Sequence, residues 1–331
     1  MRVTTSVTTD DLGSIGATAA RLEAAGFDGV TSQENRHDPF LPLTLAAAST
    51  DRLGLATNVA IAFPRSPMLA ATIAWDLQAL SNGRFTLGLG SQIKPHNEKR
   101  FSVPWSAPAP RMREYVQSIR AIFATWHTGK RLAFEGDHYR FTLMTPNFTP
   151  PPLDGDPPPI HIAAVGPNML GVAARECDGA ALHGFCTPAY LEQTVLPKLE
   201  SGLEASGRTR ADFEISGGGF VATGATNEEV DRAVEFVRKR VGFYGSTPSY
   251  WPVLETHDLL DLGHKLNAMS KAGEWDAMTA AVREDVVDLF CARGRHDELA
   301  AAIGNHFGTL VDSVGLDATT PAETVAEIQA L

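Results

Sequence analysis

The sequence has 331 residues, 44% of them hydrophobic and 20% charged, which is the composition of a globular protein with a sizeable core and excludes a disordered chain. Its 28 basic and 39 acidic residues give a formal net charge of −11, a field that repels nucleic acid and anionic membrane surfaces. We therefore expect no nucleic-acid and no membrane partner, since a polyanionic partner would need a local basic patch.

The cysteines and the amino-terminal residues indicate the compartment. Cys177, Cys186 and Cys291 are odd in number and lack the paired spacing of a zinc site or a dithiol motif, so we interpret them as reduced core thiols and predict no metal. Residues 1–7 enter a strand-like alternation without an apolar targeting segment, and no apolar run is long enough to span a bilayer. These features predict a cytoplasmic protein.

Short apolar runs alternate with longer amphipathic stretches, an order that favours a parallel sheet covered by helices. In the first unit, a strand at residues 2–8 is followed by a helical repeat from Leu12 to Ala25, which Gly26 ends. At four later junctions a capping residue directly precedes proline, which suits the first helical turn because proline lacks the N–H that would be unpaired there. These predicted helix starts are Asp38-Pro39, Ser66-Pro67, Gly166-Pro167 and Thr187-Pro188.

The same alternation predicts eight strands, and eight strands suggest a closed barrel. They cover residues 2–8, 28–34, 53–62, 85–89, 159–165, 178–183, 213–223 and 309–314. The gaps after strand four and between strands seven and eight exceed common connection lengths. We therefore predict one α/β domain over residues 1–331, a (β/α)8 TIM barrel with insertions at about 91–158 and 244–293. The first insertion contains a hairpin-like stretch, and the later one is expected to be helical to about Arg293.

In a parallel barrel the reactive groups gather where the strands end, so the residues after each strand are the candidates. After strand two, His37 is either a general acid or base, because its unperturbed pKa is near neutral, or a hydrogen-bonded structural histidine. Asp38 is either a second proton-handling group or the cap of the next helix. After strand three, Asn58 predicts irregular backbone or a ligand contact, whereas Arg65 can be a solvated charge.

Strands four and five end in segments suited to a planar, anionic ligand. Gly88 and Gly90 allow close approach of such a ligand or, equally well, of a neighbouring strand. Ser91 and Gln92 follow and can donate hydrogen bonds. The turn at 165–168 opens a helix with free N–H groups at the positive end of the helix dipole, which is a site for phosphate.

Aromatic side chains gather in the two predicted insertions, outside the regular barrel pattern. They could wall an apolar substrate pocket or build a subunit interface, and both interpretations stay open. The predicted pocket residues are His96, Trp105, Tyr250 and Trp251.

Taken together, these segments resemble the luciferase-like monooxygenase superfamily and, within it, the F420-dependent oxidoreductases. Residues 65–90 resemble the family's helix, LS-x-GRF turn and LGLG strand, here Leu80-Ser81-Asn82-Gly83-Arg84-Phe85 and Leu87-Gly88-Leu89-Gly90. His37-Asp38-Pro39 resembles the pair that follows strand two, and Val165-Gly166-Pro167-Asn168 resembles the phosphate-binding turn. The resemblance covers nearly the whole chain.

The resemblance implies an enzyme that uses coenzyme F420 to exchange a hydride with a small organic substrate, and a homodimer. His37 and Asp38 would lie beside the deazaflavin ring, and Ser91 and Gln92 would contact its polar edge. A non-prolyl cis peptide at Asn58-Val59 would support the ring.

The same resemblance implies that backbone amides of Val165, Gly166 and Asn168 hold the cofactor phosphate. Pro167 removes one donor from that turn, and Gln92 does not reproduce the acidic proton donor of sugar-phosphate-oxidising relatives, which argues against a sugar-phosphate substrate. An FMN-dependent luciferase-like monooxygenase and a non-catalytic flavin-binding barrel are the alternatives.

Overall fold

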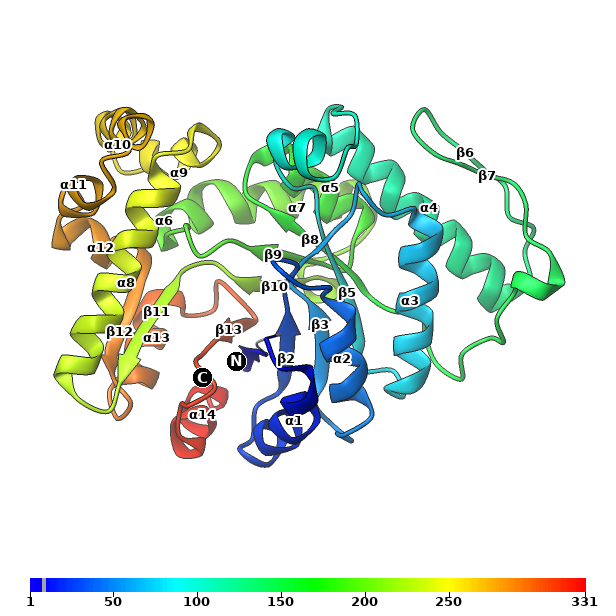
Figure 1. Ribbon diagram of the computed structural model, residues 1–331, viewed down its shortest axis with the longest axis horizontal. Coiled ribbons are helices and arrows are strands. Elements are labelled where there is room, and N and C mark those ends of the chain that lie inside the picture. The colour runs from blue at the N-terminus through cyan, green and yellow to red at the C-terminus, as the bar shows by residue number, and fades with distance from the viewer. Residues whose placement is uncertain (8–9) are drawn as a thin grey trace. The chain divides into compact units, whose positions relative to one another are not determined.

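The computed structural model describes residues 1–7 and 10–331 and has the predicted (β/α)8 barrel fold (Figure 1). The strands of its main sheet are β1 (Arg2–Ser6), β2 (Gly29–Ser32), β3 (Gly54–Thr57) with its continuation β4 (Ala60–Ile61), β5 (Phe85–Gly90), β8 (Ile160–Ala164), β9 (Gly179–Leu182), β10 (Glu214–Gly217) and β13 (Ser313–Gly315). In the described part of the chain they are neighbours in the order β3-β2-β1-β13-β10-β9-β8-β5-β4, and β3 also pairs with β5, which closes the barrel. Strand one was predicted to reach Thr8, which lies outside the described residues.

Helices follow the strands as the predicted alternation requires. They are α1 (Ile15–Ala24, after a 3-10 turn at Leu12–Ser14), α2 (Phe40–Ala47), α3 (Pro67–Leu80), α4 (Pro108–Thr128), α5 (Pro167–Glu176), α6 (Pro188–Tyr190), α7 (Leu196–Ala205), α8 (Asn227–Gly245), α9 (Trp251–Glu255), α10 (Leu260–Ala272), α11 (Trp275–Ala280), α12 (Glu284–Phe290), α13 (Leu299–Phe307) and α14 (Ala322–Gln329). The four predicted helix starts before α2, α3, α5 and α6 are confirmed to within one residue.

The chain divides into two compact units. The first unit comprises Met1–Thr4, Ala164–Leu170 and Ala181–Leu331, and the second comprises Thr5–Ala163 and Gly171–Ala180. In the second unit β2, β3, β5 and β8 are parallel neighbours, and α3 packs against both α2 and α4. The predicted hairpin is β6 (Phe134–Glu135) with β7 (Arg140–Phe141), on the far side of α4 from the strands of this unit (Figure 1).

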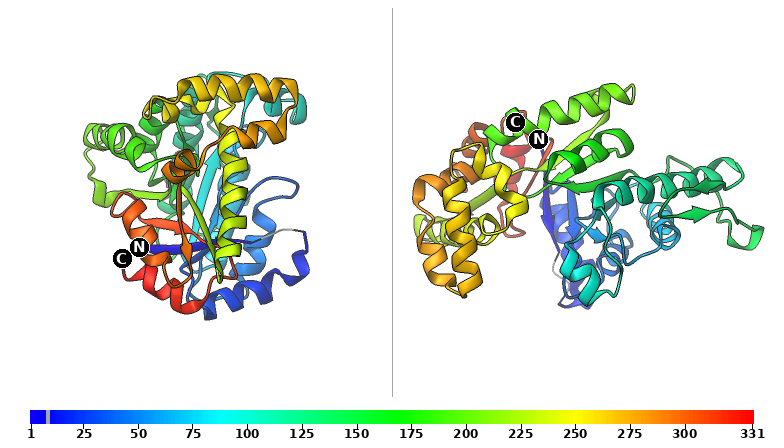
Figure 2. Two further views of the ribbon diagram at one scale, coloured as in Figure 1. Left: turned by 90° about the vertical axis from the view of Figure 1, so that its left-hand side faces the viewer. Right: turned by 90° about the horizontal axis from the view of Figure 1, so that it is seen from above.

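In the first unit, β1 and β10 both pair in parallel with β13. A separate two-stranded parallel sheet joins β11 (Phe220–Gly224) to β12 (Cys291–Arg295), and α8 packs along both strands (Figure 1). Helices α10, α11 and α12 pack against α8 in turn. The two ends of the chain lie side by side in both views of Figure 2, where the Met1 amino group donates to the Gln329 carbonyl oxygen at 3.2 Å.

Two expectations about these segments were wrong. The strand predicted at 213–223 is split, because φ values of +79° and +104° at Gly217 and Gly218 turn the chain, so that β10 stays in the barrel and β11 leaves it. The insertion predicted as helical to Arg293 ends instead in β12, whose partner is the displaced β11. In addition, residues 108–128, which were predicted to belong to the first insertion, form α4, the regular helix of the fourth βα unit.

Arg84, in the motif that carried the family resemblance, ties the start of β5 to the turn after α2. Its guanidinium donates to the carbonyl oxygens of Leu53, Thr50 and Ala47 at 2.5, 2.7 and 3.3 Å. The last carbonyls of a helix have no intrahelical partner and carry partial negative charge, so a cation stabilises them. The motif therefore positions β5 next to β3 rather than contacting a ligand.

Gly88 is required for strand packing. The Thr57 hydroxyl donates to the Gly88 carbonyl oxygen at 2.7 Å and accepts from the Gly88 N–H at 2.9 Å. A Cβ at position 88 would overlap the Thr57 carbonyl oxygen. Of the two interpretations of this glycine, close approach of a neighbouring strand is the one that the structure supports.

We predict that Gly88→Ala lowers the free energy of unfolding by about 1 to 3 kcal/mol, because β3 and β5 would have to separate to admit the methyl group. Urea unfolding followed by circular dichroism measures the change. Gly155→Ala is the matched control, since a Cβ there meets no atom within 4 Å. Equal unfolding midpoints for the two variants would contradict this account of Gly88.

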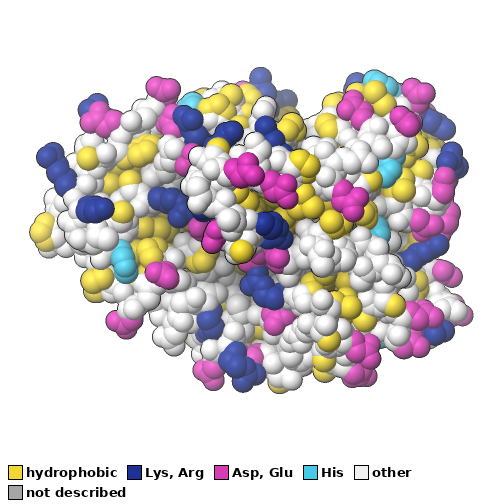
Figure 3. All heavy atoms as spheres, turned by 180° about the vertical axis from the view of Figure 1, so that it is seen from behind, with side chains coloured by type: hydrophobic (Ala, Val, Ile, Leu, Met, Phe, Trp, Pro, Cys, Tyr) yellow, Lys and Arg dark blue, Asp and Glu magenta, His cyan; other side chains and the backbone are white. Residues whose placement is uncertain are grey.

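The surface carries both signs of charge. Figure 3 shows Lys and Arg side chains interspersed with Asp and Glu on the face seen from behind. Within residues 1–7 and 10–331, no helix combines the length and the apolar character needed to cross a membrane.

Candidate functional site

An ion-paired arginine joins the segments that follow β2 and β4 in the second unit. Arg65 pairs with Glu34 through Nη1 and with Asp38 through Nη2, the latter at 3.0 Å. Nη1 also donates to the Ile61 carbonyl oxygen at 3.1 Å, and Glu34 Oε2 accepts from the Ile61 N–H at 2.7 Å. The side chains of Glu34 and Arg65 are only 9% and 18% exposed. Arg65 is therefore a half-buried bridge between two carboxylates, and its interpretation as a solvated charge was wrong.

The peptide bond between Asn58 and Val59 is cis, as predicted, and it separates β3 from β4. The Asn58 N–H donates to the Ser32 carbonyl oxygen at 2.7 Å, and the Val59 carbonyl oxygen accepts from the Glu34 N–H at 3.2 Å. Gly90 lies beside Val59, where an added Cβ would be 2.5 Å from Val59 Cγ2. The irregular backbone expected at Asn58 is confirmed, and Glu34 holds it through both its backbone and its carboxylate.

His37 and Asp38 differ in the contacts that their side chains make. Asp38 Oδ1 accepts from the Phe40 N–H at 2.8 Å, which caps the start of α2, while Oδ2 pairs with Arg65. The capping interpretation of Asp38 is thus confirmed. The His37 side chain is 46% exposed, and its Nε2 lies 3.4 Å from Asp10 Oδ1. The Asp38 side chain is 40% exposed, so the two residues are similarly accessible, but both Asp38 oxygens are engaged and the His37 ring is the less constrained of the two.

The loop after β5 is fixed by a buried asparagine. Asn97 Nδ2 donates to the carbonyl oxygens of Ser91 and Ile93 at 3.0 and 3.2 Å, and Asn97 has no solvent exposure. Gln92 has a φ of +55°, and its Oε1 accepts from the Ile93 N–H at 2.9 Å. Ser91 and Gln92 are partly exposed after the last strand residue, in the position expected of ligand contacts. In the same unit, His96 is exposed and Trp105 is partly exposed.

In the first unit, the predicted phosphate turn is a partly exposed bend before α5. The Gly166 carbonyl oxygen accepts from the N–H groups of Met169 and Leu170 at 3.1 Å, which starts the helix. The Val165 carbonyl oxygen accepts from the Tyr190 hydroxyl at 3.0 Å. A Cβ at Gly166 would meet no atom within 4 Å, so the space beside the turn is open.

His183 follows β9 in the first unit and is held as a neutral ring. Its Nδ1 accepts from the Phe185 N–H at 2.9 Å, and its ring packs on Tyr244 and Tyr250 with centroids 4.1 and 5.0 Å away. Burial and the charge of Arg240 lower the pKa of His183 from 6.5 to about 4. Since Nδ1 is an acceptor, the proton of the neutral ring lies on Nε2.

The two aromatic residues predicted for the substrate pocket in this unit have different surroundings. The Tyr250 ring belongs to the cluster around His183, and burial raises the pKa of its hydroxyl to about 12. The Trp251 indole N–H donates to the Gly245 carbonyl oxygen at 3.0 Å, and its ring packs on His264. Trp251 therefore connects α8, α9 and α10, and Tyr250 is the better placed of the two to meet a ligand.

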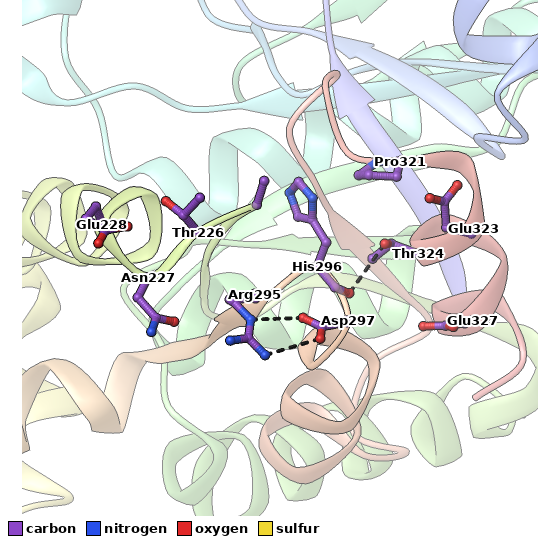
Figure 4. Close-up of a pocket in the computed structure, with 11 residues that line it drawn as sticks. Thr226, Asn227, Glu228, Arg295, His296, Asp297, Pro321, Glu323, Thr324 and Glu327 are labelled. Carbon is purple, nitrogen blue, oxygen red and sulfur yellow. Dashed lines mark hydrogen bonds and ion pairs between the residues drawn. The ribbon is translucent and has the colours of Figure 1, made fainter.

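A cavity of about 700 Å³ lies at the ends of β11 and β12 in the first unit (Figure 4). Arg295, its one arginine, is engaged by Asp297 and Glu298, and the remaining charged side chains on its wall are acidic apart from the ring of His296. Figure 4 shows Arg295 facing Asp297, so this cation has no free charge to offer a ligand.

Cys177, Cys186 and Cys291 are buried and form no disulfide bond, as predicted. Burial raises the pKa of both Cys186 and Cys291 to about 12, so both are inert thiols at neutral pH. In residues 1–7 and 10–331, no group of three His, Cys, Asp or Glu side chains is arranged to hold a metal ion.

A comparison with protein families decides what this barrel is. The model of the family described as luciferase-like monooxygenase matches residues 1–313. This chain belongs to the luciferase-like monooxygenase family. It is an enzyme of the oxidoreductase class.

Several relatives of this luciferase-like enzyme match over most of their length. An uncharacterized protein of Mycobacterium tuberculosis is 47% identical over 296 residues, covering 89% of this chain and 87% of the relative. The 5,10-methylenetetrahydromethanopterin reductase of Archaeoglobus fulgidus is 28% identical, covering 85% and 82%. The solved structure of the coenzyme F420-dependent tetrahydromethanopterin reductase of Methanopyrus kandleri has a TM-score of 0.79 at 20% identity, covering 99% and 96%. This last likeness shows the barrel fold.

Two residues whose contacts stand out in the structure, one in each unit, were not among the candidates from sequence. Glu34 stood in the correct segment, but only its contacts with Ile61 and Arg65 distinguish it from a surface carboxylate. His183 ends strand six, a position that the barrel rule singles out, yet no motif marks it. Its aromatic neighbours come from a segment some 60 residues later in the chain, at Tyr244 and Tyr250.

We predict that His183→Asn makes the stability of this luciferase-like protein less sensitive to acid. The folded imidazole takes up its proton only near pH 4, whereas the unfolded one does so near 6.5. The wild-type protein therefore loses stability, by roughly 1 to 3 kcal/mol from this group, as the pH falls from about 6.5 to about 4. Asparagine keeps an acceptor for the Phe185 N–H but does not titrate.

Urea unfolding at about pH 7 and about pH 4.5 measures this difference. His127→Asn on α4 is the control, because that histidine is exposed. A pH dependence as steep in His183→Asn as in the wild-type protein would contradict the assignment.

Proposed function

We propose that this chain is an F420-dependent oxidoreductase that exchanges a hydride between the deazaflavin and a small organic substrate. The observation that carries the proposal is the Glu34–Arg65–Asp38 cluster, which joins two segments at the carboxyl ends of barrel strands, where barrel enzymes place their active sites. The Methanopyrus kandleri protein, a coenzyme F420-dependent reductase with the same fold, supports the choice of cofactor.

The residues of each unit fit parts of this cofactor. In the second unit, Val59, whose methyl group packs over Gly90, would offer an apolar surface for the ring, and Ser91 and Gln92 would offer polar groups for its edge. In the first unit, the open space beside Gly166 and the start of α5 suit a phosphate, which the backbone amides of Val165, Gly166 and Asn168 would hold.

When bound, coenzyme F420 supplies the hydride chemistry, and the chain supplies binding, orientation and proton handling. Arg65 engages one oxygen of Asp38 and the Phe40 N–H engages the other, which leaves Asp38 as a fixed negative charge beside His37. His37, with its exposed ring, is then the group that holds or moves the proton accompanying the hydride. His96 and Trp105 in the second unit, and Tyr250 and Trp251 in the first, are the residues proposed to contact the substrate.

The second candidate is an FMN-dependent monooxygenase, which the description of the matching family favours. A non-catalytic flavin-binding barrel is the third. The three differ in which cofactor binds and in whether His37 matters once it is bound, so cofactor titration separates the first two directly.

Titration of the purified protein with F420 and with FMN, followed by fluorescence quenching, tests the proposal. We expect saturable F420 binding and no FMN binding. Arg65→Met should weaken F420 binding by about tenfold or more, because the two carboxylates lose their shared cation and the segments after β2 and β4 separate. Tight FMN binding without F420 binding would overturn the proposal.

Two controls keep that result interpretable. Arg140→Met removes an exposed, ion-paired arginine from the β6–β7 hairpin and should bind F420 as the wild-type protein does. Arg65→Lys keeps the charge but not the two-pronged geometry, so an intermediate affinity is expected. Circular dichroism of each variant separates lost binding from lost folding.

We also propose a homodimer, formed through α2 and α3. Leu41, Leu45 and Leu69 on these helices are 54%, 39% and 60% exposed, and association would bury these apolar side chains. Light scattering should give the mass of two chains, and Leu41→Glu with Leu69→Glu should give the mass of one. A wild-type mass of one chain would rule the dimer out.

A further inference from the structure

A pocket of about 440 Å³ lies between α8 and α11 in the first unit, and we name it the α8–α11 pocket. Its wall comprises Lys239, Arg240, Phe243, Tyr244, Trp275, Asp276, Met278 and Thr279. Its volume is that of a site for a small organic molecule. Two of its aromatic side chains, Phe243 and Trp275, are 49% and 50% exposed, which is unusual for rings of this size in a folded chain.

Arg240 in this pocket has no carboxylate partner among the described residues, although the chain carries a net charge of −11. The other arginines of α8 and of the segments that follow it are all paired with acids. Arg232 pairs with Glu229 and Arg238 with Glu235 and Glu284, while Arg283, Arg293 and Arg295 each pair with an acid close in sequence. The charge of Arg240 is thus left uncompensated where acids are abundant.

Aromatic rings hold the Arg240 guanidinium in place. Its central carbon lies 5.4 to 5.8 Å from the ring centres of Phe220, Phe236 and Tyr244, and one Nη donates to the Tyr244 hydroxyl at 3.3 Å. Its Nε is inaccessible to solvent and has no hydrogen-bond partner among the described residues. Because that Nε is enclosed, an external ligand would meet the Nη groups. A cation held on rings, with no acid among the described residues to neutralise it, is a receptor for an external anion.

We propose that the α8–α11 pocket binds a small organic anion with a flat apolar ring, its acid group on Arg240 and Lys239 and its ring against Trp275 and Phe243. The two rings are inclined by only 33° with centres 6.5 Å apart, so they form a broad apolar wall beside the cations. Asp276 also lines the pocket, but two cations outnumber it, and a carboxylate or sulfonate is the ligand that this balance favours.

The proposal is independent of the cofactor and of the site in the second unit. Its test therefore needs neither F420 nor turnover, and its failure would leave the proposed function untouched.

Calorimetric titration of the full chain with 2-naphthoate, and with its neutral counterpart 2-naphthalenemethanol, tests the charge requirement on the wild-type protein alone. We expect saturable naphthoate binding and at least about tenfold weaker binding of the alcohol, since the charge-assisted hydrogen bonds are lost. Equal affinities for the two compounds, or no saturable naphthoate binding in the millimolar range, would overturn the proposal.

Variants place the bound anion in the pocket. Arg240→Met keeps an apolar stem on the rings and should weaken naphthoate binding by about tenfold or more, whereas Arg232→Met on the same helix should leave it unchanged. Naphthoate should quench tryptophan fluorescence in the wild-type protein and much less in Trp275→Phe. Unchanged affinity in a folded Arg240→Met protein, or unchanged quenching in Trp275→Phe, would place the ligand elsewhere and refute the assignment.

Discussion

The bridge from Arg65 to Glu34 and Asp38 is the interaction on which the proposed cofactor site depends. Glu34 is nearly buried and contacts the backbone of β4, and Asp38 caps α2, so one guanidinium fixes a strand end, an irregular peptide and a helix start at once. A buried carboxylate is stable only with a charge partner or several donors. Removing the arginine would leave that requirement unmet in the segment that carries His37.

Rigid placement matters here because the cofactor would supply the hydride chemistry, and the protein would bind and orient the cofactor and the substrate. A shift of about 1 Å in a positioning group can cost about a hundredfold in rate. The cluster meets that need with ion pairs between the segments that follow β2 and β4, and the buried Asn97 does the same with hydrogen bonds for the loop that carries Ser91 and Gln92. The loops that hold the proposed functional groups of the second unit are thus fixed by polar contacts made within that unit.

Much of the fold could be predicted because its signals are local. Proline after a capping residue marked four helix starts, and the apolar runs marked the barrel strands. The division of strand seven could not be predicted from apolar pattern, because 213–223 reads as one strand unless the positive φ angles at Gly217 and Gly218 are known. β12 was missed for a related reason: it is a strand only because β11 leaves the barrel and needs a partner.

Candidate site residues could be named from the sequence, but the contacts that hold them could not. His37, Asp38 and Asn58 follow from the rule that strand ends carry function, and the cis peptide at Asn58–Val59 followed from family resemblance. Arg65 resembled a solvated charge because its partners are about 30 residues away in the chain. The same holds for Arg240. Its proposed role rests on the absence of a carboxylate beside its guanidinium among the described residues, and a sequence does not show which side chains are neighbours in space.

A crystal structure of the protein with F420 bound tests the central claim most directly. The account predicts the deazaflavin ring against the Asn58–Val59 peptide, with the pairs of Arg65 to Glu34 and Asp38 intact. A ring bound away from that peptide, or an Arg65 that leaves both carboxylates to reach the cofactor, would contradict it.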